Sequence, residues 1–298
     1  MSTYETAQDQ FIIVNGIRYA YRRFGLTTGI PLFLHIHFRG TMDHWDPAFI
    51  NPLAEHRPII ILDNAGVGRS EGNIPMAFTA WAQVVIDVLT ALGVKQIDLL
   101  GFSMGGCTAQ LIALNAPHLV RRLILAATIS STGEGVVHVQ GMEPFMKLKS
   151  ASTKNEQLEA FLLSFFGPSE RSQAAGKASF ERIHSARPNR VDYIDVETAE
   201  RQTVAYFNFQ KPENEDAGSY NRFLELEMPV LIANGSDDLL LPTENSYVMW
   251  KKLSNTDAQL HLYPDSGHGF LYQYANQFTK LINNFLDAEI SAAGKSRL

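Results

Sequence analysis

Short apolar runs alternate with segments of helical periodicity along most of the chain. Runs that are apolar with little alternation are typical of strands covered on both faces of a parallel sheet. Such runs occupy 31–36, 58–62, 97–100, 123–127, 230–233 and 259–263. Between them, helical patterns are expected at 78–92, which Gly93 follows, and at 106–116, 243–253 and 272–290. The alternation predicts an α/β fold with a mostly parallel, doubly wound sheet.

The N-terminal region has a different pattern. Two β-prone runs, 10–14 and 17–21, flank Asn15 and Gly16. Asn-Gly between two such runs is the strongest short-range signal for a β-hairpin. We therefore expect an antiparallel hairpin ahead of the parallel strands.

The strand–helix alternation breaks between residues 129 and 228. This segment has helical patterns at 155–166, 173–183 and 196–207 and no convincing parallel strand. Many of its residues are Met, Phe or Tyr: Met142, Phe145, Met146, Phe161, Phe165, Phe166, Tyr206 and Phe207. The pattern predicts a core of 1–128 and 229–298 with a helical cap, or lid, of 129–228 inserted after the sixth strand. The alternative is a helical subdomain whose aromatic residues pack only its own interior.

Composition and charge narrow the function classes. The 298 residues are 45% hydrophobic and carry a net charge of −6, without a run of Lys and Arg, so a nucleic-acid partner is not expected. No apolar run has membrane-spanning length and no N-terminal signal segment is recognised, which favours a cytoplasmic protein. The C-terminal Ser296-Arg297-Leu298 resembles the peroxisomal Ser-Lys-Leu address, so a eukaryotic source would predict a peroxisomal location. The single cysteine, Cys107, excludes an intrachain disulfide and is expected to be a buried filler rather than a reactive thiol.

The first chemical motif is Gly101-Phe102-Ser103-Met104-Gly105, a G-x-S-x-G sequence between an expected strand and an expected helix. A serine hydroxyl is a weak nucleophile and needs both an exposed position and a base. A sharp strand-to-helix turn exposes the hydroxyl, and flanking glycines allow the backbone to approach that closely. The alternative for the pentapeptide alone is a glycine-rich turn, and the strand-before, helix-after context favours the nucleophile.

A base and an acid follow in the expected chain order. Asp237 and Asp238 come directly after the run 230–233, and His268 comes after the run 259–263. In open α/β sheets, active sites gather on loops at the carboxyl ends of the strands. Asp238 is preferred over Asp237 because it fits a Gly-x-x-Asp-x-x-x-Pro pattern. The alternative for His268 is a histidine that only caps a turn between two glycines.

Two other features point to cofactor chemistry only weakly. His35 and His37 form a His-x-His pair, but no second cluster completes a ligand set, so no metal is expected. The glycines after the run 58–62 lack the spacing of a nucleotide-binding loop, because Gly72 lies one residue too far. No cofactor is expected.

These motifs together resemble the α/β-hydrolase superfamily, in particular its serine-nucleophile branch of cofactor-free haloperoxidases, carboxylesterases and lactonases. The resemblance covers about 10–128 and 229–290, and it includes the turn Asp63-Asn64-Ala65-Gly66-Val67-Gly68-Arg69-Ser70. It implies the α/β-hydrolase fold and a Ser103–His268–Asp238 triad that cleaves a small-molecule ester or lactone through an acyl-enzyme. The aromatic- and Met-rich segment 129–228 indicates an apolar acyl or alcohol group in that substrate. Ser103 argues against the dehalogenases and epoxide hydrolases, which use an aspartate nucleophile.

One departure from the family concerns the oxyanion hole. The family usually has His-Gly after the third strand, and the next residue supplies an amide; here the sequence is His37-Phe38-Arg39-Gly40. The resemblance implies Met104 as one amide donor, with Phe38 preferred over Arg39 as the other. The Arg39 side chain is expected to be solvated, with a substrate oxygen as the alternative partner.

Other activities stay open at the level of sequence. Carbon–carbon bond hydrolases of ring-cleavage pathways use the same three residues, and a perhydrolase would use the same acyl-enzyme with peroxide. A different class is a ligand-sensing relative that keeps the triad but signals instead of turning over substrate. The substrate-binding residues and the oligomeric state cannot be deduced from the sequence.

Overall fold

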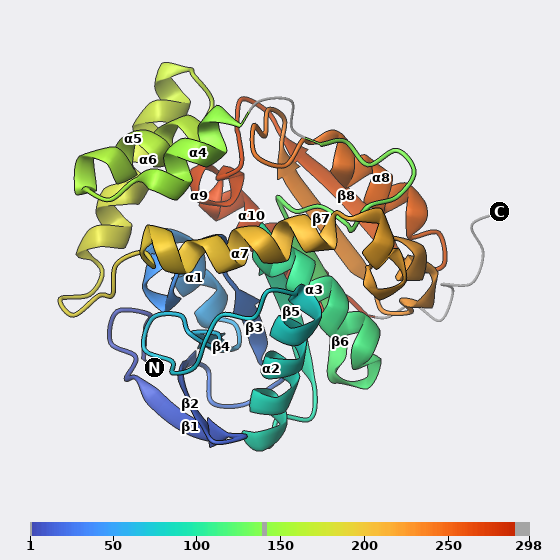
Figure 1. Ribbon diagram of the computed structural model, residues 1–298. Helices are drawn as coiled ribbons and strands as arrows, with labels where there is room; N and C mark the ends of the chain where they lie inside the picture. Colours follow the sequence, from blue (N-terminus) through green and yellow to red (C-terminus); the bar gives the residue numbers. More distant parts are fainter. Residues whose placement is uncertain (1, 139–141, 290–298) are drawn as a thin grey trace.

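The computed structural model describes residues 2–138 and 142–289. Its centre is an eight-stranded sheet with the order β1-β2-β4-β3-β5-β6-β7-β8 (Figure 1). The strands are β1 (Gln10–Val14), β2 (Ile17–Gly25), β3 (Leu32–His35), β4 (Pro58–Leu62), β5 (Ile97–Phe102), β6 (Val120–Ala126), β7 (Val230–Gly235) and β8 (Ala258–Tyr263). The β1–β2 and β2–β4 pairs are antiparallel and the others are parallel, so the mostly parallel α/β sheet and the N-terminal hairpin are confirmed.

Helices cover both faces of the sheet. One hydrophobic core joins alternate strand residues such as Phe33 and Leu123 to α2 (Phe78–Ala91), α3 (Met104–Asn115) and α8 (Glu244–Lys252). The other joins the neighbouring residues Leu34 and Ile124 to α1 (Pro47–Ala54), α9 (Phe270–Gln273) and α10 (Ala275–Asp287). Burial of consecutive strand residues on opposite faces explains why the strands lack an apolar–polar alternation.

The segment between β6 and β7, residues 127–229, is called the β6–β7 insertion below. Its helices are α4 (Glu143–Ser150), α5 (Lys154–Phe165), α6 (Glu170–Ser185) and α7 (Val196–Phe209), followed by the 3₁₀ helices η3 (Pro212–Ala217) and η4 (Tyr220–Glu225). Side-chain oxygens cap the first turns: Thr153 for α5, Ser169 for α6 and Asp195 for α7. In Figure 1, α4, α5 and α6 stand together at the upper left, and α7 runs below them across the view of the strands.

The insertion does not pack only on itself. The Phe165 ring lies 5.8 Å from the ring of Phe102 at the end of β5. Phe161, Phe165 and Phe180 belong to the same hydrophobic core as strand residues of the sheet. The insertion therefore shares one hydrophobic core with the sheet.

Three elements differ from the sequence-based expectations. The expected helix at 272–290 is interrupted at Tyr274, which separates α9 from α10, and residue 290 lies outside the described residues. The helix α1 was not expected, because Pro52 lies inside it and proline normally breaks a helical pattern. The helix α4 was also missed; it is short and has no fully buried residue.

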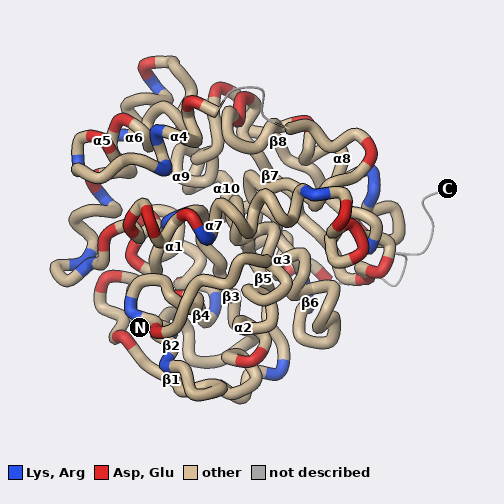
Figure 2. Tube along the Cα trace, viewed as in Figure 1, with Lys and Arg blue, Asp and Glu red and all other residues tan. Residues whose placement is uncertain are grey.

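Charged residues are spread over many elements of the fold, and Figure 2 shows basic and acidic positions interspersed along the chain. In the ranges that the structure covers, no helix has both the length and the apolarity needed to cross a membrane. The tripeptide Ser296-Arg297-Leu298 lies outside the described residues.

Candidate active site

Ser103 lies at the sharp turn between β5 and α3. Its backbone has φ 60° and ψ −125°, and residues other than glycine rarely adopt such a positive φ. The turn is held because Ser103 N–H donates to Ala126 O at 2.9 Å and Thr128 Oγ1 donates to Ser103 O at 2.7 Å. A sharp strand-to-helix turn of this kind is the structural context that the G-x-S-x-G motif predicts.

The glycines around Ser103 are required by close contacts. A Cβ at Gly101 would lie 2.4 Å from Gly105 O, and one at Gly105 would lie 2.2 Å from His35 O. A Cβ at Gly106 would meet the Thr128 side chain at 2.5 Å. The strand, the helix and the neighbouring β3 therefore approach so closely that any side chain would force the turn apart.

His268 is held by Asp238. Its Nδ1 lies 2.8 Å from Asp238 Oδ2, and both side chains are almost fully buried. The other carboxylate oxygen, Oδ1, accepts the N–H groups of Leu240 and Leu241 at 2.8 and 2.9 Å. Asp237 is exposed, and its carboxylate accepts a hydrogen bond from the Ser236 hydroxyl. The structure thus pairs His268 with Asp238 and not with Asp237.

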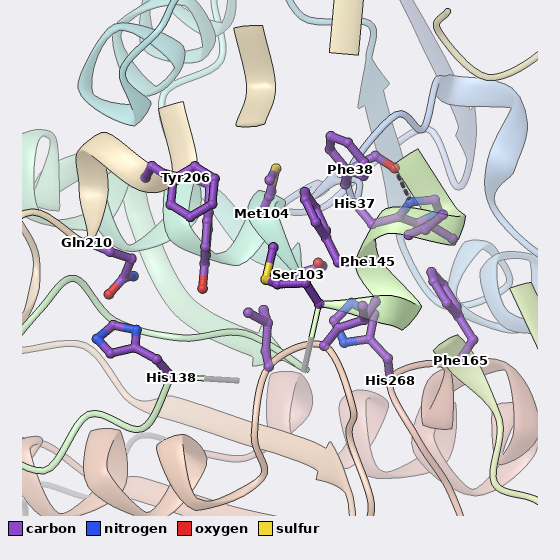
Figure 3. Close-up of a pocket in the computed structure, with 15 residues that line it drawn as sticks. His37, Phe38, Ser103, Met104, His138, Phe145, Phe165, Tyr206, Gln210 and His268 are labelled. Atoms are coloured by element: carbon purple, nitrogen blue, oxygen red, sulfur yellow. Dashed lines mark hydrogen bonds between the residues drawn. The ribbon is translucent and has the colours of Figure 1, made fainter. Parts of the chain in front are cut away.

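Ser103 and His268 line the same cavity, which has a volume of about 190 Å³ (Figure 3). The rings of Phe102 and Phe165 pack against the His268 ring at centroid distances of 5.2 and 5.1 Å. Within the described ranges no hydrogen bond joins Ser103 Oγ to His268. Catalytic hydrogen bonds are often long before substrate binds and tighten in the complex.

The backbone of the β3–α1 loop distinguishes the two candidate oxyanion donors. Arg39 N–H donates to Gln202 Oε1 at 2.8 Å and is therefore occupied. The N–H groups of Phe38 and Met104 have no acceptor among the described residues, and both residues line the cavity. Met104 is the first residue of α3, where a helix leaves its N–H groups unpaired. The geometry favours Phe38 over Arg39.

The Arg39 side chain is buried, with 4% of its surface exposed, so the expectation of a solvated arginine is wrong. Its Nε donates to Ile194 O at 2.8 Å, and its Nη1 contacts Leu148 O, Lys149 O and Ala151 O at 2.8 to 3.0 Å. The carbonyls all belong to the insertion. Arg39 therefore ties the β3–α1 loop to the insertion.

The two histidines of the His-x-His pair have separate surroundings. His35 contacts Asn64 and packs on the Trp81 ring, whereas His37 contacts Phe38 O through Nδ1 at 2.8 Å. Burial lowers the pKa of each imidazole to about 4, so both rings are neutral near pH 7. In the part of the chain that is described, no group of three or more His, Cys, Asp or Glu residues could hold a metal ion. Cys107 is buried, and burial raises the pKa of its thiol to about 12.

The turn after β4 supports the loop that carries Phe38. The Asp63 carboxylate accepts the N–H groups of Met42 at 2.7 Å and Arg69 at 2.9 Å. A Cβ at Gly68 would lie 2.2 Å from Asp63 Oδ2, so glycine is needed there. Burial raises the pKa of Asp63 to about 6. This motif positions backbone and does not line the cavity.

Several cavity residues had no assigned role in the sequence. Polar ones are His138, Tyr206 and Gln210, and apolar ones include Leu148, Leu240 and Leu241. The aromatic and Met content of 129–228 indicated an apolar lining, and Met142, Phe145, Phe165, Tyr206 and Phe207 do line the cavity. The positions of Gln210 and His138 carried no recognisable signal.

The chain is similar to known proteins in sequence and fold. A family model described as "alpha/beta hydrolase fold" matches residues 30–273. A solved α/β-hydrolase fold protein from Chitinophaga pinensis is 34% identical with a TM-score of 0.86, over 97% of this chain and 100% of that one. The 2-hydroxymuconate semialdehyde hydrolase of Pseudomonas putida is 27% identical over 243 residues, 78% of each chain. The enol-lactonase of Burkholderia xenovorans LB400 is 18% identical with a TM-score of 0.70, over 94% of this chain and 100% of that one.

Proposed function

The chain belongs to the α/β-hydrolase family, and we propose that it is a serine hydrolase that cleaves an ester or lactone through an acyl-enzyme. Ser103 is the nucleophile, His268 the general base and Asp238 the group that orients the imidazole. The observation that carries the proposal is that Ser103, at a strained elbow, and His268, bonded to Asp238 at 2.8 Å, line one cavity.

The steps follow from the positions of the groups. His268 takes the Ser103 proton as Oγ attacks the substrate carbonyl, and Asp238 stabilises the imidazolium that forms. The N–H groups of Phe38 and Met104 donate to the oxyanion, and each such donor is typically worth about 10²–10³ in rate. His268 then protonates the leaving alkoxide, and a water that it activates releases the acyl group. No cofactor is needed for any of these steps.

The cavity lining favours an uncharged substrate. Apart from histidines, its residues are apolar or neutral and include no Lys, Arg, Asp or Glu. Burying an unpaired carboxylate or ammonium against such a wall would be strongly unfavourable. An ester or lactone with apolar substituents matches this surface.

A carbon–carbon bond hydrolase is the second candidate, because a relative 27% identical to this chain is a 2-hydroxymuconate semialdehyde hydrolase. Muconate-type substrates carry a carboxylate, which needs a cationic partner. Arg39 does not line the main cavity, and its guanidinium binds carbonyls of the insertion. The ester or lactone is therefore the preferred substrate.

We also propose that residues 129–228 act as a cap over the nucleophile, with 1–128 and 229–298 as the core. In support, α4, α5 and α7 supply lining residues: Phe145, Leu148, Phe165, Tyr206 and Phe207. A cap of this kind limits the access of bulk water to the nucleophile and sets the shape of the substrate.

A substrate panel tests the proposed reaction. The protein is assayed with p-nitrophenyl esters of increasing acyl length, with lactones of matched size and with a ring-cleavage dienoate. We expect the largest kcat/KM among esters or lactones, and its loss in a folded Ser103→Ala variant. If Ser103→Ala retains turnover, Ser103 is not the nucleophile. If the ring-cleavage dienoate has the largest kcat/KM, the protein is instead a carbon–carbon bond hydrolase.

A further inference from the structure

Gln210 lines the cavity, and one hydrogen-bonding atom of its side chain is satisfied by nothing in the described structure. The residue caps α7 and lines the cavity. Its Nε2 donates to Ser130 O at 2.8 Å. Because a carbonyl oxygen cannot take the place of this donor, the bond fixes the orientation of the side-chain amide. The opposite atom, Oε1, is buried and has no hydrogen-bond partner among the described residues.

Tyr206 lies one helical turn earlier and also lines the cavity. Its hydroxyl makes no hydrogen bond to any residue that the structure describes. Burial raises the pKa of the phenol above its ordinary value, so the hydroxyl stays protonated and can donate as well as accept. Figure 3 shows Tyr206 and Gln210 on one side of Ser103, with His268 and Phe165 on the other.

An unpaired buried acceptor is unfavourable in a folded protein unless a partner arrives. The two cavity-lining residues together leave a lone pair and a rotatable O–H without a partner among the described residues. A carboxylate does not fit, because Gln210 Oε1 would repel it. An ammonium group does not fit either, since the lining has no acidic side chain. The exposed His138 also lines this end of the cavity. An uncharged group that donates a hydrogen bond, a hydroxyl or an amide N–H, satisfies Oε1, and the hydroxyl oxygen or the amide carbonyl can accept from Tyr206.

We propose that Gln210 Oε1 and Tyr206 Oη form a polar subsite that selects substrates bearing a hydroxyl or amide N–H away from the scissile carbonyl. This inference rests on the proposed ester or lactone hydrolysis at Ser103. It gives the substrate class a second feature: an apolar body with one uncharged hydrogen-bond donor. Tyr206 and Gln210 act here as specificity-determining residues and take no part in the chemical steps.

The test uses four matched p-nitrophenyl ester series with the terminal groups methyl, hydroxyl, methoxy and acetamido, each over a range of chain lengths. Methoxy resembles hydroxyl but cannot donate. At the best-fitting length we expect kcat/KM for the hydroxyl or acetamido ester to exceed that of the methoxy ester by about tenfold, the effect of one net hydrogen bond. The arm with the larger ratio identifies the donor as hydroxyl or amide N–H.

Variants assign the effect to the subsite. Gln210→Met should reduce the donor-to-methoxy ratio toward 1. Tyr206→Phe should instead lower kcat/KM of the hydroxyl, acetamido and methoxy esters relative to the methyl ester, because an oxygen of each terminal group can accept from the Tyr206 hydroxyl. Asn208→Leu is the matched control on the same helix, because the Asn208 amide donates to Met76 O outside the cavity; this variant should keep the wild-type ratio. If Gln210→Met does not fold, Tyr206→Phe and the wild-type ratio still decide the outcome.

A binding measurement separates failure of the subsite from failure of the hydrolase assignment. Calorimetry with folded Ser103→Ala and non-hydrolysable ketone analogues should give about tenfold tighter binding of the hydroxyl or acetamido compound than of the methoxy one. Ratios within twofold of 1 at every length, in both kinetics and binding, would overturn the subsite even if Ser103 is the nucleophile. A clear binding preference without turnover of any ester or lactone would keep the subsite and overturn the hydrolase assignment.

Discussion

Replacing Arg39 with Met tests whether this side chain holds the β3–α1 loop against the insertion. The guanidinium is buried and reaches four carbonyls of the insertion through Nε and Nη1. Methionine has a similar length and no donor, so the substitution removes the hydrogen bonds while it retains much of the packing.

The magnitude follows from the donors that are lost. Nε carries one N–H and Nη1 carries two, and the Nη1 hydrogens are shared among three carbonyls. A hydrogen bond from a charged group contributes about 1.5–3 kcal/mol. Taking the lower value for three N–H groups gives a loss of about 4.5 kcal/mol in the free energy of unfolding, and the loss is smaller where water reaches the carbonyls. Because the adjacent Phe38 supplies a proposed oxyanion donor, kcat should also fall.

Urea unfolding monitored by tryptophan fluorescence measures this loss. The control is Arg18→Met, which removes an exposed ion pair with Glu71 and should cost less than about 1 kcal/mol. A change of less than about 1 kcal/mol for Arg39→Met, similar to that of the control, would refute the reasoning. If Arg39→Met is destabilised but keeps its kcat, the Arg39 hydrogen bonds do not position the β3–α1 loop for catalysis.

Three further predictions concern the triad, the elbow and pH. Asp238→Asn should lower kcat by about 10⁴-fold with the protein still folded, while Asp237→Asn should stay within about twofold; equal effects on an ester assay would contradict the pairing. Gly105→Ala should unfold the protein or cost more than about 3 kcal/mol because His35 O blocks its Cβ, whereas Gly93→Ala, with open space around it, should cost only about 1 kcal/mol by urea titration. The buried His35 has a pKa of about 4 against 6.5 when unfolded, so it contributes stability above pH 6.5 that is lost as pH falls toward 4; His35→Asn should flatten that part of the stability–pH profile, and an unchanged slope would contradict it.

Local patterns in the sequence were sufficient to predict the core of the fold. The hairpin at Asn15-Gly16 and the unbroken apolar runs correspond to β1, β2 and the parallel strands, because these signals depend on neighbouring residues only. The helix α1 was missed, because Pro52 lies inside the helix while Asp46 caps its first turn. Short-range patterns therefore predicted the strands, whereas the helix α1 forms against the expectation for a segment that contains proline.

In the candidate site, too, some residues could be predicted from local sequence and others could not. Ser103, Asp238 and His268 follow strands in a fixed order, and local motifs mark Ser103 and Asp238, so the sequence indicated all three. Arg39 was expected to be solvated because its partners, such as Ile194 O, come from backbone more than 100 residues away, and backbone carbonyls leave no sequence signal. The choice between Phe38 and Arg39 likewise depended on Gln202, which only the folded chain brings to the Arg39 amide.

The most direct test of the account is phosphonate labelling followed by peptide mapping. A p-nitrophenyl alkylphosphonate should add once per chain, at Ser103, and His268→Gln should slow the labelling by several orders of magnitude. A label on another residue, or a labelling rate at Ser103 that His268→Gln leaves unchanged, would contradict the claim that the buried imidazole activates this hydroxyl.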